Sequence, residues 1–231
     1  MNEKSEMIIA IIDYGLGNLF SVRNACKHVG LNAEITNDKN VIEKADAAIL
    51  PGVGAFNVAM KNLEKLDLIG PIKSFVDSGR PFMGICLGLQ LLFTESEEFG
   101  VSRGLDLIGG CVVKFPAMNN DGKKVKVPQI GWNRIYKSNR TFSNKGNCLL
   151  KEIEDGEFMY FVHSFYVEPF AETNILTKTN YGGIEYCSSI SFKNVFGVQF
   201  HPEKSGKKGI GIYSKWAESI NNLERNEVEY E

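Results

Sequence analysis

Residues 81–93 of the chain read PFMGICLGLQLLF and contain the clearest structural pattern in the sequence. The first part, Phe82–Ile85, is a short apolar run, which predicts a buried strand. Apolar residues at helical spacing follow, at Leu89, Leu92 and Phe93. Cys86 lies between the two patterns, with a glycine two residues before it and another two residues after it. A strand that turns sharply into a helix crowds the residue at the corner, and small neighbours relieve that crowding.

We interpret Cys86 as a nucleophile at the corner between strand and helix. The corner would lift its sulfur clear of the sheet edge, where the first free N–H groups of the helix favour the thiolate over the thiol. The alternative is a structural cysteine buried at the end of an apolar strand. The paired glycines and the change from strand to helix favour the nucleophile, although serine hydrolases and other cysteine enzymes use the same corner.

The composition is that of an ordinary soluble globular protein of 231 residues, 43% hydrophobic and 23% charged. Its net charge of −2 argues against a nucleic-acid-binding protein that relies on a broad basic face. No apolar run approaches the ~20 residues of a membrane span, and the first residues lack the layout of a signal peptide. We expect a single domain over residues 1–231, with residues 1–6 and 224–231 as frayed ends, and no nucleic-acid or membrane partner.

The cysteines predict a reduced, cytoplasmic protein without a metal site. They form an odd, scattered set with no C-x-x-C pair, and no export signal accompanies them, which argues against a disulfide framework or a zinc site. The set is Cys26, Cys86, Cys111, Cys148 and Cys187. Three histidines are too few for a histidine-rich metal centre. The glycines of residues 15–17 lack the third glycine of a dinucleotide fingerprint, because residue 20 is phenylalanine, so we expect no cofactor.

Short apolar strands alternate with amphipathic helices through the first half of the chain. The predicted strands are residues 7–12, 33–36, 47–50 and 82–85. The predicted helices are residues 19–29, with Asn18 as N-cap, then 55–65 and 68–78. This alternation predicts an α/β fold with a doubly wound, largely parallel sheet and helices on both faces. The glycine loop at residues 51–54 then lies at the carboxyl end of a strand, where open α/β sheets bind ligands.

After about residue 104 the pattern changes to short β-rich segments separated by turn residues. They are residues 111–115, 124–127, 135–136, 157–167, 174–177, 184–190 and 195–200. We interpret them as hairpins added to one flank of the same sheet, which gives an antiparallel β-rich flank. A closing helix is predicted at residues 209–222.

Residues 197–203, GVQFHPE, supply the best candidate for a base. The apolar run predicts His201 at the end of a strand, because Pro202 disfavours helical dihedrals at the residue before it. In extended geometry His201 and Glu203 point the same way, so the carboxylate can hold one ring nitrogen while the other faces a thiol. Together with Cys86 this predicts a Cys/His/Glu catalytic triad.

An oxyanion hole and a rival base also follow from the sequence. The N–H of Leu87 is one candidate donor, and Gly52 or Val53 in the glycine loop could supply the other. His163 is the rival base. Its aromatic neighbours on both sides favour a packed, supporting histidine over a catalytic one.

Two of these motifs resemble the signatures of class I, triad-type, glutamine amidotransferases, whose fold is flavodoxin-like. They are residues 84–90 (GICLGLQ) and 199–203 (QFHPE). Four further stretches resemble, more narrowly, the glutaminase subunits of imidazole glycerol phosphate synthase. These are residues 13–18 (DYGLGN), 50–56 (LPGVGAF), 131–133 (GWN) and 160–164 (YFVHS). The resemblance extends from about residue 8 to residue 216.

The resemblance implies the chemistry of a glutaminase. Cys86 would attack the side-chain amide of glutamine, and His201, held by Glu203, would move the proton. Ammonia would leave, and water would then hydrolyse a glutamyl thioester. The positions implied to hold the substrate are Gln90 and the backbone of Ser164 and Phe165.

The resemblance also implies a partner. The ammonia would pass to a separate (β/α)8-barrel synthase subunit, which converts the phosphoribosyl intermediate PRFAR into imidazole glycerol phosphate and AICAR in histidine biosynthesis. Asn18, Trp132 and Lys204 match positions that face this partner, although simple core packing is an alternative for Trp132. Such glutaminases are typically quiescent until the partner's ligand rearranges the glycine loop, and Val53 is the expected hinge because a β-branched residue resists a flipped peptide.

One segment departs from the family pattern. Residues 127–133 read VPQIGWN, with Gln129 and Ile130 where a His-Met pair is expected, in a segment implied to face the partner. Paralogues that feed ammonia to related barrel enzymes in amidino-sugar biosynthesis are therefore an alternative. A stand-alone γ-glutamyl cysteine hydrolase is a second one. A non-enzymatic binding module is disfavoured, because the nucleophile and the base are both present.

Overall fold

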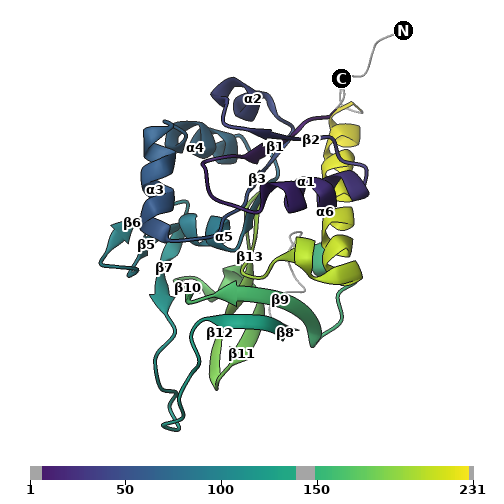
Figure 1. The fold of residues 1–231 in the computed structure, drawn as a ribbon. Helices are drawn as coiled ribbons and strands as arrows, with labels where there is room; N and C mark the ends of the chain where they lie inside the picture. Colours follow the sequence, from purple (N-terminus) through teal and green to yellow (C-terminus); the bar gives the residue numbers. More distant parts are fainter. Residues whose placement is uncertain (1–6, 139–148, 229–231) are drawn as a thin grey trace.

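A mixed sheet forms the centre of the protein (Figure 1). The computed structural model describes residues 7–138 and 149–228, with only the backbone of residues 222–228. The parallel half of the sheet has the strand order β2-β1-β3-β4-β13. These strands are β1 (Ile9–Ile12), β2 (Ala33–Thr36), β3 (Ala47–Leu50), β4 (Phe82–Ile85) and β13 (Val195–Val198). All but β2 are buried along their whole length, which is why they are apolar runs without alternation.

Helices cover both faces of this parallel half. They are α1 (Leu19–His28), α2 (Lys39–Lys44), α3 (Phe56–Lys65), α4 (Ile69–Asp77), α5 (Leu87–Leu91) and α6 (Gly206–Val228). Ile9 and Ile11 of β1 share a core with α1 and α6, which lie together on one side of the sheet in Figure 1. Ala10 and Ile12 share the opposite core with α2, α3 and α4. The predicted doubly wound α/β arrangement is confirmed.

The antiparallel flank continues the same sheet from β13. From there the order is β12 (Ile184–Phe192), β10 (Phe165–Pro169), β7 (Ile108–Lys114), β5 (Phe93–Ser96) and β6 (Ser102–Arg103). A branch leaves β12 through β11 (Ile175–Tyr181), β8 (Gln129–Lys137) and β9 (Glu157–His163). Two 3-10 turns, η3 (Glu172–Asn174) and η4 (Pro202–Lys204), connect strands and helix on this side. Added antiparallel strands on one flank were predicted, and the structure confirms them, except that β5 pairs with β7 in parallel.

The helix after Cys86 is shorter than its apolar spacing predicts. It ends at Leu91, and Phe93 begins β5. The reason lies elsewhere in the chain, because the N–H groups of Leu105 and Asp106 bind the carbonyls of Leu91 and Phe93. The returning segment therefore takes the backbone acceptors that a longer helix would use.

Other boundaries also differ from the predicted ones. The predicted strand at residues 124–127 forms only an isolated bridge between Met118 and Lys124, and the predicted strand at 157–167 divides at Ser164 into β9 and β10. Helix α2 was missed, because six residues are too few to establish a period. Helix α6 extends beyond 209–222 at both ends, and it continues through part of the expected frayed tail, where the sequence retains good helix formers. Residues 1–6 and 229–231 lie outside the described residues.

Asn18 directly precedes α1, as predicted, but its side chain makes no capping hydrogen bond. Gly30 closes the helix with a φ of +81°, a conformation that favours glycine. No helix in the described part of the chain is both long and apolar enough to cross a membrane.

Candidate active site

Cys86 occupies a strained corner between β4 and α5. Its φ of 54° and ψ of −109° are rare for a residue with a side chain. A Cβ on Gly88 would lie 1.7 Å from the Leu50 carbonyl oxygen, and one on Gly84 would lie 3.0 Å from the Leu89 Cα. The corner therefore requires the two glycines that flank the cysteine, as the sequence predicts.

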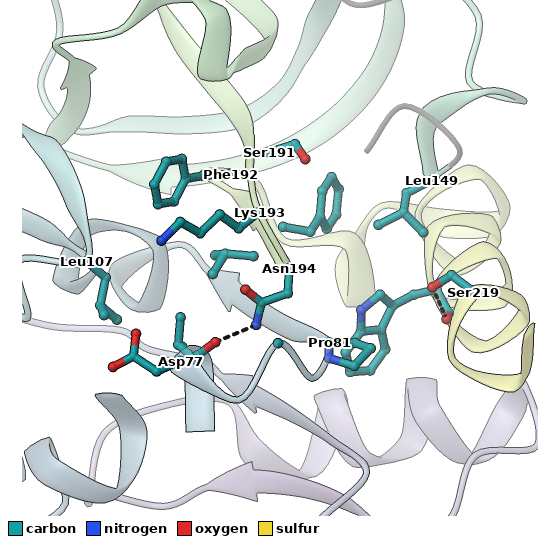
Figure 2. Close-up of a pocket in the computed structure, with 14 residues that line it drawn as sticks. Asp77, Pro81, Leu107, Leu149, Ser191, Phe192, Lys193, Asn194 and Ser219 are labelled. Carbon is teal, nitrogen blue, oxygen red and sulfur yellow. Dashed lines mark hydrogen bonds between the residues drawn. The ribbon is translucent and has the colours of Figure 1, made fainter. Parts of the chain in front are cut away.

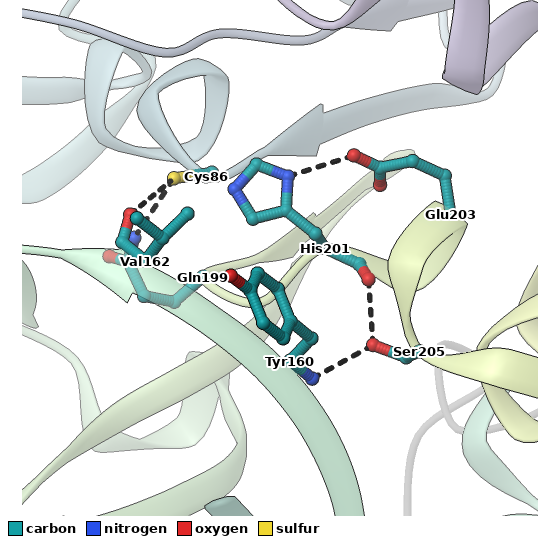
Figure 3. Close-up of polar contacts among 7 residues, drawn as sticks. All are labelled: Cys86, Tyr160, Val162, Gln199, His201, Glu203 and Ser205. Carbon is teal, nitrogen blue, oxygen red and sulfur yellow. Dashed lines mark hydrogen bonds and ion pairs between the residues drawn. The ribbon is translucent and has the colours of Figure 1, made fainter. Parts of the chain in front are cut away.

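His201 and Glu203 lie together beside this corner, both almost fully buried. The Nδ1 of His201 is 2.8 Å from the Glu203 Oε1, so the carboxylate holds the proton on that nitrogen. The other ring nitrogen makes no hydrogen bond within the described residues, and it faces the Cys86 sulfur in Figure 3. The three predicted residues are thus brought together in the order thiol, imidazole, carboxylate.

The predicted reason for the His201–Glu203 contact is wrong, although the contact exists. Strand β13 ends at Val198, three residues before His201, and Glu203 lies in the 3-10 turn η4 that begins at Pro202. His201 itself is extended, with a φ of −103° and a ψ of 94°. The tight turn, not a continued strand, brings the carboxylate back to the ring.

Ser205 fixes the backbone of His201 to β9, and sequence reasoning missed it. Its hydroxyl donates to the His201 carbonyl at 2.6 Å and accepts from the Tyr160 N–H at 3.0 Å. The His201 N–H in turn donates to the Tyr160 carbonyl at 2.9 Å. Ser205 is buried, so these bonds are shielded from water (Figure 3).

The electrostatic surroundings of His201 favour its charged form. Burial by itself lowers the pKa of the ring, but the neighbouring Cys86 sulfur and the Glu203 carboxylate outweigh burial and raise the pKa above its ordinary value. An imidazole that gains a proton readily beside a thiol suits a proton acceptor in nucleophilic catalysis.

Gln199 and a backbone carbonyl lie next to the sulfur, and Gln90 contacts Gln199. The Gln199 Nε2 lies 3.7 Å from the Cys86 sulfur, and the Val162 carbonyl oxygen lies 3.8 Å from it. The Gln90 Nε2 donates to the Gln199 Oε1 at 3.1 Å and to the Phe165 carbonyl at 2.8 Å. Gln90 and Phe165, both predicted to hold substrate, are therefore in direct contact. The sequence pattern included Gln199 without indicating this position.

The glycine loop packs against the start of α5. A Cβ on Gly52 would lie 2.2 Å from the Tyr14 hydroxyl and 2.8 Å from the Leu87 Cβ, so only glycine fits there. The Tyr14 hydroxyl donates to the Pro51 carbonyl at 2.8 Å and fixes the base of the loop. Val53 is 38% exposed at its tip. The predicted donor positions Gly52 and Leu87 are thus neighbours beside Cys86, and Tyr14 supports them.

Glu98 is a further residue that sequence reasoning missed. Its Oε2 accepts the Phe56 N–H at 2.6 Å, at the first residue of α3 after the glycine loop. Glu98 also lines a cavity of about 660 Å³ together with Ser164 and Phe165, the predicted substrate backbone. A glutamate just after a strand carries no distinguishing pattern in the sequence.

His163 is a packed histidine, as the sequence favours. Its Nδ1 lies 2.8 Å from the Phe165 carbonyl oxygen and its Nε2 lies 3.3 Å from the Tyr186 hydroxyl, so both ring nitrogens are engaged. Burial lowers its pKa to about 4, which keeps the ring neutral. His163 therefore does not compete with His201 as the base.

Trp132, Lys204 and Asn18, which were predicted to face the partner, are at or near the surface. Gln129, in the same segment as Trp132, is not. Trp132 is 55% exposed and lies edge-on to Tyr160, so the core-packing alternative for Trp132 is wrong. Lys204 is exposed and Asn18 is half-buried. Gln129, which departs from the family pattern, is only 2% exposed, so the expectation that it faces a partner is wrong.

A second cavity, of about 570 Å³, is drawn in Figure 2 with the residues that line it. It lies where β4 and β13 begin, whereas Cys86 follows the end of β4. Pro81 and Asn194, which directly precede β4 and β13, line it together with Trp216 of α6. In the described residues no cluster of three histidines, cysteines or acids could hold a metal ion. The cysteines that the structure describes are free thiols.

The family described as Glutamine amidotransferase class-I matches residues 10–214, most of the chain. The chain belongs to this family. The amidotransferase chain is 44% identical over 210 residues to the imidazole glycerol phosphate synthase subunit HisH of Geobacter metallireducens, covering 90% of this chain and 97% of that one. It is also 44% identical over 218 residues to the HisH subunit of Aquifex aeolicus, covering 94% and 99%. The narrower resemblance, to the HisH subunits, is thereby confirmed.

Solved structures confirm the amidotransferase fold. A putative GMP synthase protein from Thermoplasma acidophilum superposes on this amidotransferase with a TM-score of 0.68 at 15% identity, covering 98% of both chains. A glutamine amidotransferase from Thermotoga maritima gives a TM-score of 0.59 at 16% identity, covering 96% of this chain and 86% of that one.

Proposed function

We propose that this chain is the glutaminase subunit of imidazole glycerol phosphate synthase, and that it supplies ammonia for histidine biosynthesis. The observation that carries the proposal is Cys86 on its strained corner, facing the free nitrogen of a histidine whose other nitrogen is bound by Glu203. HisH relatives that match over nearly their whole length support the choice among amidotransferases.

The reaction begins with transfer of the thiol proton of Cys86 to the Nε2 of His201. The sulfur attacks the side-chain amide carbon of glutamine, and negative charge develops on the amide oxygen. N–H donors from Leu87 and from Gly52 or Val53 would stabilise this charge, and each such donor contributes ~3 kcal/mol or more in comparable enzymes. His201 then gives its proton to the leaving nitrogen, the C–N bond breaks, and ammonia departs from a glutamyl thioester.

Water completes the cycle. His201 accepts a proton from the attacking water, the C–S bond breaks, and the thiol of Cys86 is restored as glutamate leaves. Glu203 keeps its own charge throughout and stabilises the imidazolium that forms in both halves of the reaction. Gln90 and the backbone of Ser164 and Phe165 would hold the substrate.

The partner surface lies on the outward face of β8 and β9. Side chains alternate along a strand, so Ile130 and Trp132 point outward where Gln129 points inward. Ile130 is 63% exposed and pairs with Val162, whose carbonyl lies against the Cys86 sulfur. A (β/α)8-barrel synthase docked on this face, with Asn18 and Lys204 at its edge, would receive ammonia close to where it forms and use it to convert PRFAR.

The assay is glutamate release by the chain alone and by the chain with PRFAR and its barrel subunit. We expect PRFAR and the barrel subunit together to stimulate glutamate release strongly. Cys86→Ala should abolish glutamine-dependent synthesis while synthesis from ammonium salts continues. Glutaminase activity that survives in Cys86→Ala would show that the nucleophile is misassigned.

The same assay separates the alternatives. Stimulation only by a barrel enzyme of amidino-sugar biosynthesis would contradict the histidine pathway. Vigorous cleavage of γ-glutamyl peptides without any partner would indicate a stand-alone hydrolase.

A further inference from the structure

A buried polar chain crosses the inner face of β8, β9 and β12, next to the proposed glutamine pocket. Gln129 and His163 stand opposite each other in the β8–β9 ladder. The Tyr186 hydroxyl of β12 lies 3.0 Å from the Gln129 Oε1 and 3.3 Å from the His163 Nε2. All three side chains are buried, so no bulk water competes for these hydrogen bonds.

The chain ends on a single carbonyl in the pocket. The Phe165 carbonyl oxygen lies 2.8 Å from the His163 Nδ1 and 2.8 Å from the Gln90 Nε2. A carbonyl oxygen has two lone pairs, and here each faces a donor. The orientation of the Phe165 peptide and the position of the Gln90 side chain are therefore determined together.

The proton positions follow from the donors and acceptors. A carbonyl can only accept, so the His163 Nδ1 carries a proton, and a neutral ring then has an Nε2 that accepts. The Tyr186 hydroxyl has a single proton, which goes to the Gln129 Oε1 as that amide stands and is free to go to the His163 nitrogen once the amide is turned. The Gln129 Nε2 has no partner among the described residues. Turning the Gln129 amide end for end preserves its shape and lets its N–H donate to the Tyr186 oxygen.

We infer that His163 is a positioning residue for glutamine binding, which holds the Phe165 carbonyl and, through it, Gln90, while Tyr186 and Gln129 fix its tautomer. The inference rests on the proposed glutaminase function. The ring nitrogens of His163 bind the Phe165 carbonyl and the Tyr186 hydroxyl and not the Cys86 sulfur. Its contribution is to keep one lone pair of a pocket carbonyl occupied, so that Gln90 stays in place to receive the substrate.

A purely packing role makes a different prediction. The His163 ring lies among aromatic rings, 5.3 Å from Phe115, 5.7 Å from Phe161 and 5.4 Å from Tyr186 between ring centroids. If packing were its only role, an apolar side chain of similar size would serve. Asn and Leu form a matched pair, because the Asn amide nitrogen can replace the Nδ1 donor and Leu cannot.

The experiment compares two reagents that alkylate Cys86. One is 6-diazo-5-oxo-L-norleucine, which has the shape of glutamine and needs the pocket, and the other is iodoacetamide, which does not. We expect His163→Leu to slow the glutamine-shaped reagent about tenfold while iodoacetamide stays within about twofold, since a buried acceptor is left without its donor. His163→Asn should keep both rates within about threefold of wild type. With the barrel subunit present, the KM for glutamine should rise in His163→Leu far more than kcat falls.

The inference would be overturned if the Asn and Leu variants lost the same share of the alkylation rate with the glutamine-shaped reagent, or if the Leu variant lost none of it. Thermal unfolding shows whether each variant folds. If neither His163 variant folds, Tyr186→Phe decides, because it retains the ring and removes only the hydroxyl that lies between the His163 Nε2 and Gln129. Tyr186→Phe should slow alkylation by the glutamine-shaped reagent about threefold. An unchanged ratio between the rates of the two reagents would refute the inference drawn from these hydrogen bonds. A wild-type protein that reacts with iodoacetamide but never with the glutamine-shaped reagent would overturn the proposed function, and the inference with it.

Discussion

Position 88 has no room for even a methyl side chain. A Cβ on Gly88 would lie 1.7 Å from the Leu50 carbonyl oxygen, a backbone atom of β3 that cannot rotate away. We expect Gly88→Ala to lower the free energy of unfolding by about 2 kcal/mol or more, because the strand or the corner must shift. Equilibrium unfolding in urea measures the difference. Gly211→Ala is the control, since a Cβ at Gly211 in α6 meets nothing within 4 Å and alanine should add up to about 1 kcal/mol. Similar effects of the two changes would show that the corner tolerates a side chain.

His163 makes the native protein sensitive to acid. Burial lowers its pKa to about 4, whereas the ring has a pKa of about 6.5 in an unfolded chain. As the pH falls through this interval the unfolded chain binds a proton that the native protein does not, so native stability falls. At about 1.4 kcal/mol per pKa unit the loss from this residue amounts to about 3 kcal/mol. The free energy of unfolding, measured near pH 7 and near pH 4.5, should therefore drop less between these two pH values in His163→Asn than in wild type. Equal drops in the two proteins would contradict the low pKa of His163.

The proposed catalytic residues could be found from the sequence because each belongs to a local motif. The glycines around Cys86 and the HPE sequence at His201 are short patterns whose chemistry is readable without a fold. The contact between His201 and Glu203 was predicted from extended geometry, but a 3-10 turn makes it. Spacing of two residues is compatible with both geometries, so the sequence predicted the contact and could not predict the turn.

At the scale of elements, the turn η4 depends on Ser205. Its hydroxyl satisfies the His201 carbonyl and the Tyr160 N–H, both at the joint between η4 and β9. Ser205→Ala should lower the free energy of unfolding by about 2 kcal/mol, because two backbone groups lose a buried partner. It should also lower kcat, since the His201 backbone is released. Unfolding and glutaminase assays check the two effects.

Ser214→Ala is the matched control for Ser205→Ala. The Ser214 hydroxyl donates only to the Ile210 carbonyl within α6, at 3.4 Å, so its removal should change stability by less than about 0.5 kcal/mol. If Ser205→Ala behaved like this control, η4 would be held without the hydroxyl, by the His201–Glu203 contact and the backbone bonds from the Lys204 and Ser205 N–H groups.

Elements with strong local patterns could be predicted, and elements shaped by distant segments could not. The strands Ala33–Thr36 and Ala47–Leu50 have the predicted bounds. The end of α5 at Leu91 depends on the returning backbone at Leu105, which lies beyond two further strands. A single sequence gives no sign that these two segments meet.

On the scale of the whole molecule, the site forms where the two halves of the sheet meet. The parallel half supplies Cys86 at the end of β4, and the antiparallel flank supplies Val162 and Phe165 from β9 and β10. Gln199 follows β13, the last parallel strand, and bridges Gln90 and the sulfur. These contacts join residues more than 70 positions apart, so the sequence could indicate the participants but not the way they surround the sulfur.

The same junction lies beside the face proposed for docking of the synthase. The Val162 carbonyl of β9 lies against the Cys86 sulfur and Val162 pairs with Ile130 of β8, so a partner on the outward face of these strands would lie next to the proposed site of ammonia release. Trp132 stands on this face, 55% exposed, with Tyr160 packed against its edge. A large aromatic side chain of this kind contributes much of the binding energy in protein interfaces, often 2 kcal/mol or more, which corresponds to about a thirtyfold weaker Kd when it is removed.

We therefore expect Trp132→Ala to weaken the complex with the barrel subunit by about thirtyfold in a titration, while alkylation of Cys86 by iodoacetamide stays unchanged. Phe170→Ala is the control, because Phe170 is 74% exposed and follows β10 beside Gly109 of β7, not on the β8–β9 face. If exposure alone made an aromatic residue bind the partner, the two changes would weaken the complex alike. A loss confined to Trp132→Ala would place the docking face over the nucleophile, because Trp132 is separated from Val162 by only one pair of the same strand ladder.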